Sequence, residues 1–180
     1  MLTKLTTMAA LALTLISGSA SAAFIGAYDV SSWTQSLNGG SIDLAGAPDI
    51  VGLTSSNDGS GPDNTDFTIA AAGTGLVSFD WAYTNGDGEG STYDPFGWLL
   101  NGVFTQLTAD GQFGTQNGST SFVVNSGDVF GFRIFSTDSG FGASTASVRG
   151  FSAPIPEPAS LALLGIGLAG LGAMRRRKKA

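Results

Sequence analysis

The side chains best suited to bind a ligand in this chain are carboxylates gathered in one glycine-rich segment. Residues 85–90 read Asn-Gly-Asp-Gly-Glu-Gly, and Asp94 follows shortly afterwards. Asp87, Glu89 and Asp94 therefore offer three carboxylates beside an amide. Ca²⁺ takes about six to eight oxygen ligands from groups of this kind, so we predict a Ca²⁺ site at these three residues. The spacing is not that of an EF-hand loop, and the alternative is that Asp, Asn and Gly simply form turns here.

Other acidic residues could in principle do chemistry, but no pair is singled out. A second cluster comprises Asn57, Asp58, Asp63, Asn64 and Asp66. Glycoside hydrolysis needs two carboxyl groups, yet the stretch 23–153 contains one Glu and 12 Asp without a distinctive spacing. The whole chain lacks His and Cys, and 23–153 lacks Lys. These absences exclude the usual zinc sites, Ser-His-Asp and Cys-His catalysis and Schiff-base chemistry. We therefore predict a protein that is not an enzyme and has no catalytic residues.

Aromatic side chains are a second class of candidate, because exposed rings can stack on sugars. Tyr93 and Trp98 flank the turn at Asp94-Pro95, which favours a surface position, so we predict a ligand-binding role for both. Trp81 and Tyr83 alternate with polar residues on the same strand face as Val77 and Phe79, so these two rings are expected in the core.

The charge of the central region limits its partners. Between residues 23 and 153 there are 13 acidic side chains and two arginines, a net charge of −11. Nucleic-acid phosphates require Lys and Arg, so no nucleic-acid partner is expected. Divalent cations suit such a surface, with Ca²⁺ as the candidate cofactor, although acidity also serves to keep an exported domain soluble.

The elements that must position these residues are short strands separated by turns. Dense Asn-Gly, Asp-Gly and Ser-Gly steps alternate with runs of period-2 hydrophobicity, which is typical of half-buried antiparallel strands. We predict an all-β fold, an antiparallel β-sandwich of jelly-roll type, over residues 23–153. The expected strands, about nine in number, are 24–30, 50–54, 67–71, 77–83, 96–100, 103–107, 121–124, 130–134 and 143–151.

Two local features of the sandwich follow from single residues. Asn101-Gly102 tolerates positive φ at both positions, so it predicts a two-residue type I′ hairpin between its flanking strands. Asp80 and Arg133 lie on polar strand faces, and we expect that they could pair across a sheet.

The two ends of the chain have the patterns of sorting segments. Residues 1–22 combine one lysine, an apolar run and small residues, which predicts a signal peptide cut after Ala22, with Ala20 completing the site. The alternative is an uncleaved anchor. At the other end, Pro156-Glu157-Pro158 precedes an apolar helix at 159–174 and basic residues at 175–179. A helix of 16 residues spans ~24 Å, less than a ~30 Å hydrocarbon core. We therefore expect a transient or permanent inner-membrane helix with its basic end in the cytoplasm.

The layout of residues 154–180 resembles the PEP-CTERM sorting domain. The resemblance rests on Ile155-Pro156-Glu157-Pro158-Ala159-Ser160, the short glycine-containing helix and the basic cluster, although Val is commoner than Ile before the first Pro. It implies recognition by exosortase and processing at or near Pro156-Glu157-Pro158, in a Gram-negative bacterium that makes exopolysaccharide. Signal peptidase is the other partner expected during processing. It also implies export to the cell surface, outer envelope or extracellular matrix.

The central region is also familiar. Phe79-Asp80-Trp81-Ala82-Tyr83, residues 93–98 and residues 127–132 resemble the extracellular β-domains that often precede such tails. That resemblance supports the fold and the destination and implies no activity. Our leading hypothesis is thus a non-catalytic envelope or matrix protein associated with exopolysaccharide. The alternative is a Ca²⁺-assisted carbohydrate-binding module.

Overall fold

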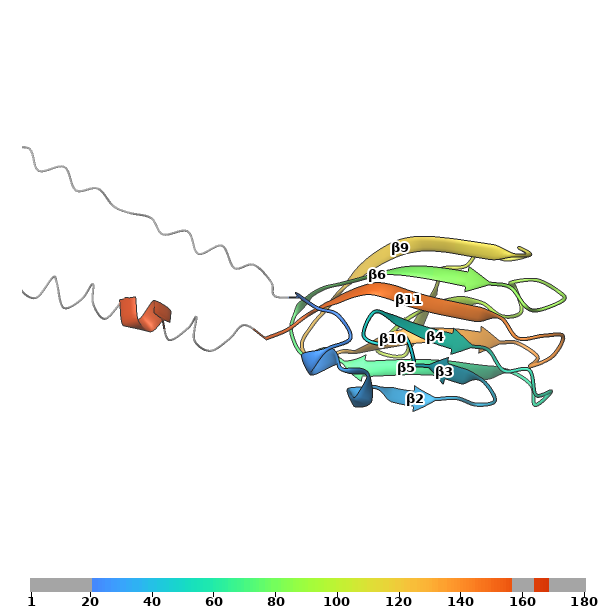
Figure 1. The fold of residues 1–180 in the computed structure, drawn as a ribbon, viewed down its shortest axis with the longest axis horizontal. Helices are drawn as coiled ribbons and strands as arrows, with labels where there is room; N and C mark the ends of the chain where they lie inside the picture. Colours follow the sequence, from blue (N-terminus) through green and yellow to red (C-terminus); the bar gives the residue numbers. More distant parts are fainter. Residues whose placement is uncertain (1–20, 157–163, 169–180) are drawn as a thin grey trace, which may run out of the picture.

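The computed structural model describes residues 21–156 and 164–168, and within them two antiparallel sheets face each other (Figure 1). One sheet has the order β3-β4-β11-β6-β9, with β1 also pairing with β11. Its strands are β1 (Ser21–Ala22), β3 (Ser41–Asp43), β4 (Ile50–Thr54), β6 (Gly75–Thr84), β9 (Thr115–Val124) and β11 (Thr145–Pro154). The other sheet has the order β2-β5-β10-β7-β8. Its strands are β2 (Thr34–Ser36), β5 (Asp63–Ala70), β7 (Phe96–Leu100), β8 (Val103–Gln106) and β10 (Val129–Ser136).

The pairing of the strands is that of a jelly roll. β4 pairs with β11, β5 with β10, β6 with β9 and β7 with β8, all antiparallel. The chain is thus one long two-stranded ribbon whose successive segments fold alternately into the two sheets. This confirms the predicted all-β sandwich and its jelly-roll type.

The tip of that ribbon is the predicted hairpin. Asn101 and Gly102 have φ of 50° and 82°, and Leu100 pairs with Val103 across them. Positive φ at both central residues is what a type I′ turn requires, so the prediction for this turn is confirmed.

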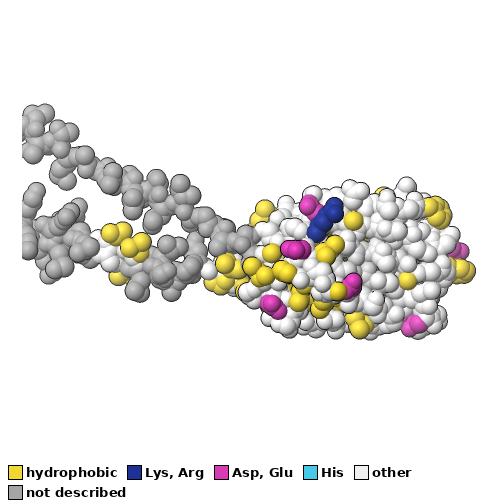
Figure 2. Space-filling view, viewed as in Figure 1, with side chains coloured by type: hydrophobic (Ala, Val, Ile, Leu, Met, Phe, Trp, Pro, Cys, Tyr) yellow, Lys and Arg dark blue, Asp and Glu magenta, His cyan; other side chains and the backbone are white. Residues whose placement is uncertain are grey.

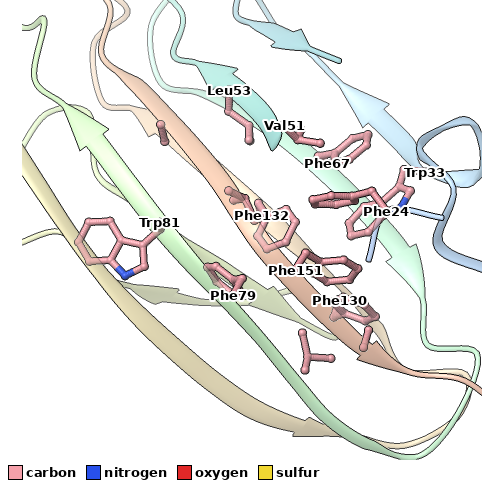
Figure 3. Packing of buried hydrophobic residues seen from close by; sticks show 14 of the residues in the cluster. Phe24, Trp33, Val51, Leu53, Phe67, Phe79, Trp81, Phe130, Phe132 and Phe151 are labelled. Carbon is pink, nitrogen blue, oxygen red and sulfur yellow. The ribbon is translucent and has the colours of Figure 1, made fainter. Parts of the chain in front are cut away.

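The core lies between the sheets and is largely aromatic. Val77, Phe79, Trp81 and Tyr83 on β6 are all buried, as their alternation predicted. Figure 3 shows the rings of Phe24, Trp33 and Phe132 close together between the sheets. The Trp33 ring stacks on Phe132 at a centroid distance of 5.6 Å and an interplanar angle of 15°.

The segment after β1 differs from its prediction as a strand over 24–30. It forms two 3-10 turns, η1 (Gly26–Tyr28) and η2 (Val30–Ser32). Gly26 has φ of 60°, which interrupts an extended chain, and the Tyr28 hydroxyl donates to Pro154 O at 2.6 Å. The spacing of the buried rings in this segment is therefore set by turns and does not follow period 2. The short strands β2 and β3 were not predicted.

The expected pairing of Asp80 with Arg133 is wrong. Arg133 lies on β10, and its Nε and Nη2 each donate to an Asp66 carboxylate oxygen at 2.6 Å. Asp80 lies on β6 in the other sheet, in register with Arg149 of β11. Sequence alternation placed Asp80 and Arg133 on polar faces without showing that those faces belong to different sheets.

The sandwich has a proximal end, where the two terminal segments of the chain join it, and a distal end on the opposite side. At the proximal end β1 and the last residues of β11 pair, so the chain enters and leaves there (Figure 1). At the distal end Thr54, Thr84 and Thr145 are aligned in register. The loops 55–62, 85–95, 107–114 and 137–144 therefore all lie at the distal end.

Several predicted segments lie outside the described residues. They are the signal peptide up to Ala20, Glu157 and Pro158 of the sorting motif, residues 159–163 and 169–174 of the apolar helix, and the basic residues 175–179. Residues 164–168 are helical. Of the helices in the described part of the chain, none has the length and apolar character needed to cross a membrane.

Candidate functional site

The acidic residues predicted to bind metal lie in the loop that joins the two sheets at the distal end. Asp94 is 0% exposed and Asp87 is 2% exposed, whereas Glu89 lies on the surface. The structure thus brings Asp87 and Asp94 into the protein interior and leaves Glu89 outside. Acidic side chains are seldom buried to this extent without a partner, so the pair requires a physical account.

Asp94 is held by both neighbouring loops. Its Oδ2 accepts a hydrogen bond from Ser55 Oγ at 2.7 Å and another from the Ser144 backbone N–H at 2.9 Å. The Ser144 N–H also donates to Ser55 Oγ at 2.8 Å. Ser55 follows β4 and Ser144 precedes β11, whereas Asp94 precedes β7 in the facing sheet. The Asp94 carboxylate therefore ties the two sheets together at this end.

The second oxygen of each buried carboxylate has no hydrogen-bond partner. Asp87 Oδ1 accepts from the Glu89 N–H at 2.6 Å, but Asp87 Oδ2 and Asp94 Oδ1 are buried and unpartnered. Leaving a buried polar atom without a hydrogen bond costs about 1–3 kcal/mol, and more for a charged group. Ser56 Oγ is a third such atom, but it lies beside Gly39.

The surroundings of this pair are negative. Burial raises the pKa of Asp87, and the charges of Asp94 and Asp138 raise it further, against the lowering effect of the Glu89 N–H. Burial likewise raises the pKa of Tyr83 to about 12, with Asp94 and Asp87 adding to the effect. The two arginines of the described region lie elsewhere, with Arg133 bound to Asp66 and Arg149 exposed on β11. A carboxylate pair of this kind attracts a cation.

The raised pKa of Asp87 predicts a pH dependence of stability. The folded state binds the Asp87 proton more tightly than the unfolded state, so this contribution is complete below the ordinary pKa of 3.8. It is lost as the pH rises through the raised folded value. In metal-free buffer, Asp87→Asn should therefore weaken the decline in unfolding free energy as the pH rises above the ordinary pKa of 3.8, as measured by urea titration.

The comparison with wild type isolates this effect from other carboxyl groups. Hydrogen bonds lower the pKa values of Asp29, Asp58 and Asp128, so these groups act in the opposite direction in both proteins. Identical pH profiles of wild type and Asp87→Asn would contradict the prediction.

The two aromatic residues predicted to bind ligand have different surroundings. Trp98 lies on β7, is half-buried and stacks on Phe122 at 4.0 Å with an interplanar angle of 5°. One face of its indole is thus covered by the edge of the core. Tyr93 is half-buried within the acidic loop, where its N–H donates to Gly90 O at 3.1 Å. Ligand binding by Tyr93 and Trp98 stays a prediction.

The most exposed rings at the distal end are two that the sequence reasoning missed. Phe113 and Phe141 are each 70% exposed. They flank the acidic loop: the Gly88 N–H donates to Phe141 O at 3.0 Å, and a Cβ on Gly90 would lie 3.4 Å from the Phe113 ring. Figure 2 shows hydrophobic side chains beside acidic ones at this right-hand end. The sequence pattern that could have indicated their exposure is a phenylalanine flanked by glycines, as in Gly140-Phe141-Gly142.

Phe141 is also held in an unusual backbone conformation. Its φ is 59°, which is uncommon for a residue with a bulky side chain and is found mainly where surrounding contacts fix it. The adjacent Gly142 N–H donates to Asn57 Oδ1 at 3.0 Å. Backbone hydrogen bonds on both sides therefore keep the Phe141 ring on the surface.

A metal site made only of carboxylates is not present in the described part of the chain. No group of three or more His, Cys, Asp or Glu side chains there is arranged to hold a metal ion. Asp87 and Asp94 could hold a cation only with neutral oxygen atoms and water completing its shell.

The other functional segment lies at the proximal end. Pro154 is the last residue of β11 and is buried, and Pro156 is exposed two residues later. Ala22, before the predicted signal cleavage point, pairs with Ala153 through β1. The predicted signal cleavage point therefore lies beside the end of β11, after which the Pro156 motif begins.

Comparisons with known proteins identify this C-terminal segment. The family model of the PEP-CTERM protein-sorting motif matches residues 154–178, so the chain carries that motif, as its residues indicated. No curated protein matches the chain.

Solved structures with a similar arrangement include carbohydrate-binding modules of family 35. The module from Clostridium thermocellum is 12% identical, with 66% of this chain and 92% of that chain covered and a TM-score of 0.36. A module from an environmental isolate is 15% identical, with 69% and 93% covered and a TM-score of 0.40. The module of Cellvibrio japonicus Abf62 is 16% identical, with 68% and 91% covered and a TM-score of 0.36.

Proposed function

We propose that this protein is exported, sorted by exosortase through its C-terminal motif, and displayed as a non-catalytic β-sandwich at the cell surface or in the extracellular matrix. The observation that carries the proposal is the PEP-CTERM motif at 154–178, which begins at the last residue of β11. The folded domain and the sorting segment are thus joined without a long linker. An enzyme or anchor that binds the C-terminal segment would therefore also determine where the sandwich is held.

The arrangement of the two ends supports a display role. β11 ends at the proximal end, so the residue at which the sorting motif begins and the distal loops lie at opposite ends of the sandwich (Figure 1). We propose that the distal loops are the surface that meets extracellular material, with exopolysaccharide as the partner. Burial of Asp87 and Asp94 also argues against these two residues acting as a glycosidase pair, because both catalytic carboxyl groups must reach the sugar.

A second candidate function is Ca²⁺-assisted carbohydrate binding. It is favoured by the exposed rings of Phe113 and Phe141 on either side of the acidic loop. Aromatic faces present large, rigid apolar area, which suits the apolar faces of sugar rings. In this alternative the distal loops bind polysaccharide through a specific site, whereas in the first proposal the sandwich is only surrounded by it.

The sorting role can be tested in a Gram-negative host that carries an exosortase. Replacing Pro156, Glu157 and Pro158 together by alanine should leave the precursor unprocessed in the inner-membrane fraction, because the enzyme's recognition motif is gone. Wild type should instead appear, shortened, in the surface or extracellular fraction. Immunoblots of the separated fractions give the distribution, and mass spectrometry gives the new C-terminus.

The matched control is Ile155→Val, which changes the neighbouring residue but keeps the motif and should be sorted like wild type. A host lacking exosortase should retain all three proteins in the membrane. Normal shortening and release of the alanine variant would overturn the proposal.

A further inference from the structure

The buried carboxylates at the distal end lack a counter-charge. Asp87 Oδ2 and Asp94 Oδ1 accept no hydrogen bond, and both residues are almost fully buried. Ser144 brings the two groups together, because its Oγ accepts a hydrogen bond from the Gly86 N–H, next to Asp87, at 3.1 Å, and its own N–H donates to Asp94 Oδ2 at 2.9 Å. Neither arginine in the described part of the chain forms a salt bridge with these carboxylates: Arg133 binds Asp66, and Arg149 lies exposed on β11.

A proton would satisfy this arrangement less well than a metal ion. Protonating Asp87 would remove only one of the two negative charges of this buried pair. Burial of an ionised carboxylate without a partner is costly. A divalent cation between the two groups would neutralise both charges and coordinate both free oxygens.

The available ligand atoms indicate which cation fits. The acidic loop offers oxygen ligands: besides the two carboxylates it carries the side-chain carbonyl of Asn85, whose amide donates to the Asp87 backbone carbonyl at 2.6 Å. Asn85 Oδ1 accepts only a long hydrogen bond of 3.4 Å from the Tyr83 hydroxyl. Ca²⁺ accepts carboxylate, amide and backbone oxygens in irregular geometry, whereas Mg²⁺ demands a near-ideal octahedron and retains most of its water.

We propose that Asp87 and Asp94 bind a Ca²⁺ ion at the distal end of the sandwich, with Asn85, backbone carbonyls and water completing its shell. Glu89, on the surface, is not a required ligand. Because Asp94 also binds Ser55 and the Ser144 N–H, the ion would lock three loops together. It would thereby fix the loop that carries Phe141. The inference does not depend on the sorting role, whose readout is the location of the protein.

The test uses the purified full-length chain, stripped of metal with a chelator and then supplied with CaCl₂ alone. At Ca²⁺ about 100-fold above its dissociation constant, the melting temperature should rise by about 5–10 °C, and excess chelator should reverse the shift. Isothermal titration should give one ion per chain. Asp87→Asn and Asp94→Asn should each abolish binding, while Asp49→Asn, an exposed acid on another loop, should bind like wild type.

The possible results separate the alternatives. Loss of Ca²⁺ binding in a variant counts only if its circular dichroism spectrum is that of wild type, and Asp87→Asn is the safer variant because Asp94 also joins the loops. A wild-type protein that neither binds Ca²⁺ nor changes its melting temperature would overturn the proposal. Ca²⁺ binding by a folded Asp87→Asn variant would also overturn it. A third contrary result would be a wild-type protein whose melting temperature does not respond to Ca²⁺ and which Asp87→Asn stabilises, because the two carboxylates would then share a proton.

Discussion

Phe132→Ala is expected to lower the free energy of unfolding by about 3–5 kcal/mol. Phe132 is 0% exposed and packs in the middle of the sandwich. Its ring packs edge-on against Phe79 of the facing sheet, with a centroid distance of 4.9 Å, and stacks on Trp33, with a centroid distance of 5.6 Å. It also contacts Phe24 of the N-terminal segment at 6.4 Å. Alanine would leave a cavity lined by parts of both sheets, and such a rigid aromatic cluster cannot collapse to fill it.

Urea or guanidinium unfolding monitored by tryptophan fluorescence measures this loss. The matched control is Val103→Ala on β8, where the side chain is 68% exposed and the expected change is within about 0.5 kcal/mol. A loss below about 1.5 kcal/mol for Phe132→Ala would mean that the site repacks, and that Phe132 is not the centre of the core.

Gly86→Ala is expected to destabilise the distal end by about 3 kcal/mol, the upper end of the range for overpacking. A Cβ on Gly86 would lie 1.9 Å from the Ala143 carbonyl oxygen. Backbone atoms cannot rotate away as a side chain can, so the loops 85–95 and 137–144 would have to separate. That separation would also displace Ser144 from Asp94, and with it the proposed ion site.

The control for this substitution lies two residues away in the same loop. A Cβ on Gly88 would be 3.5 Å from Phe141 O, an ordinary contact, so Gly88→Ala should leave both stability and Ca²⁺ affinity nearly unchanged. Denaturant unfolding and calcium titration of the two variants give the comparison. Equal behaviour of Gly86→Ala and Gly88→Ala would show that the two loops are not closely packed in solution.

The strands and the turn with strong local patterns were predictable from sequence. Val77 to Tyr83 alternate clearly, and Asn101-Gly102 specifies its own turn, so both were correct. The segment from Phe24 to Trp33 was not, because Gly26 and the hydrogen bond of Tyr28 to Pro154 determine its path. That bond joins residues 126 apart in sequence, and no local pattern reports it.

In the candidate site too, residues close in sequence were predictable and contacts between distant residues were not. Asp87 and Asp94 were predicted together because they are neighbours in one loop. The hydrogen-bond partners of Asp94, Ser55 and Ser144, are 39 and 50 residues away from it in sequence, and the jelly-roll pairing of β4 with β11 brings these two serines together. Phe113 and Phe141 were missed because hydrophobicity argues for burial, whereas their glycine-rich loops hold them outside.

The position of β11 has a consequence for mechanical load. This strand carries the sorting tail at its end and pairs with both β4 and β6. If the tail is anchored while the distal loops are held by surrounding matrix, tension runs along the strand axis. Hydrogen bonds in an antiparallel sheet are perpendicular to that axis, so the ladders on both sides of β11 would be sheared as a group and would not open one bond at a time. Under such a load the domain would transmit the pull from its loops to its tail without peeling apart.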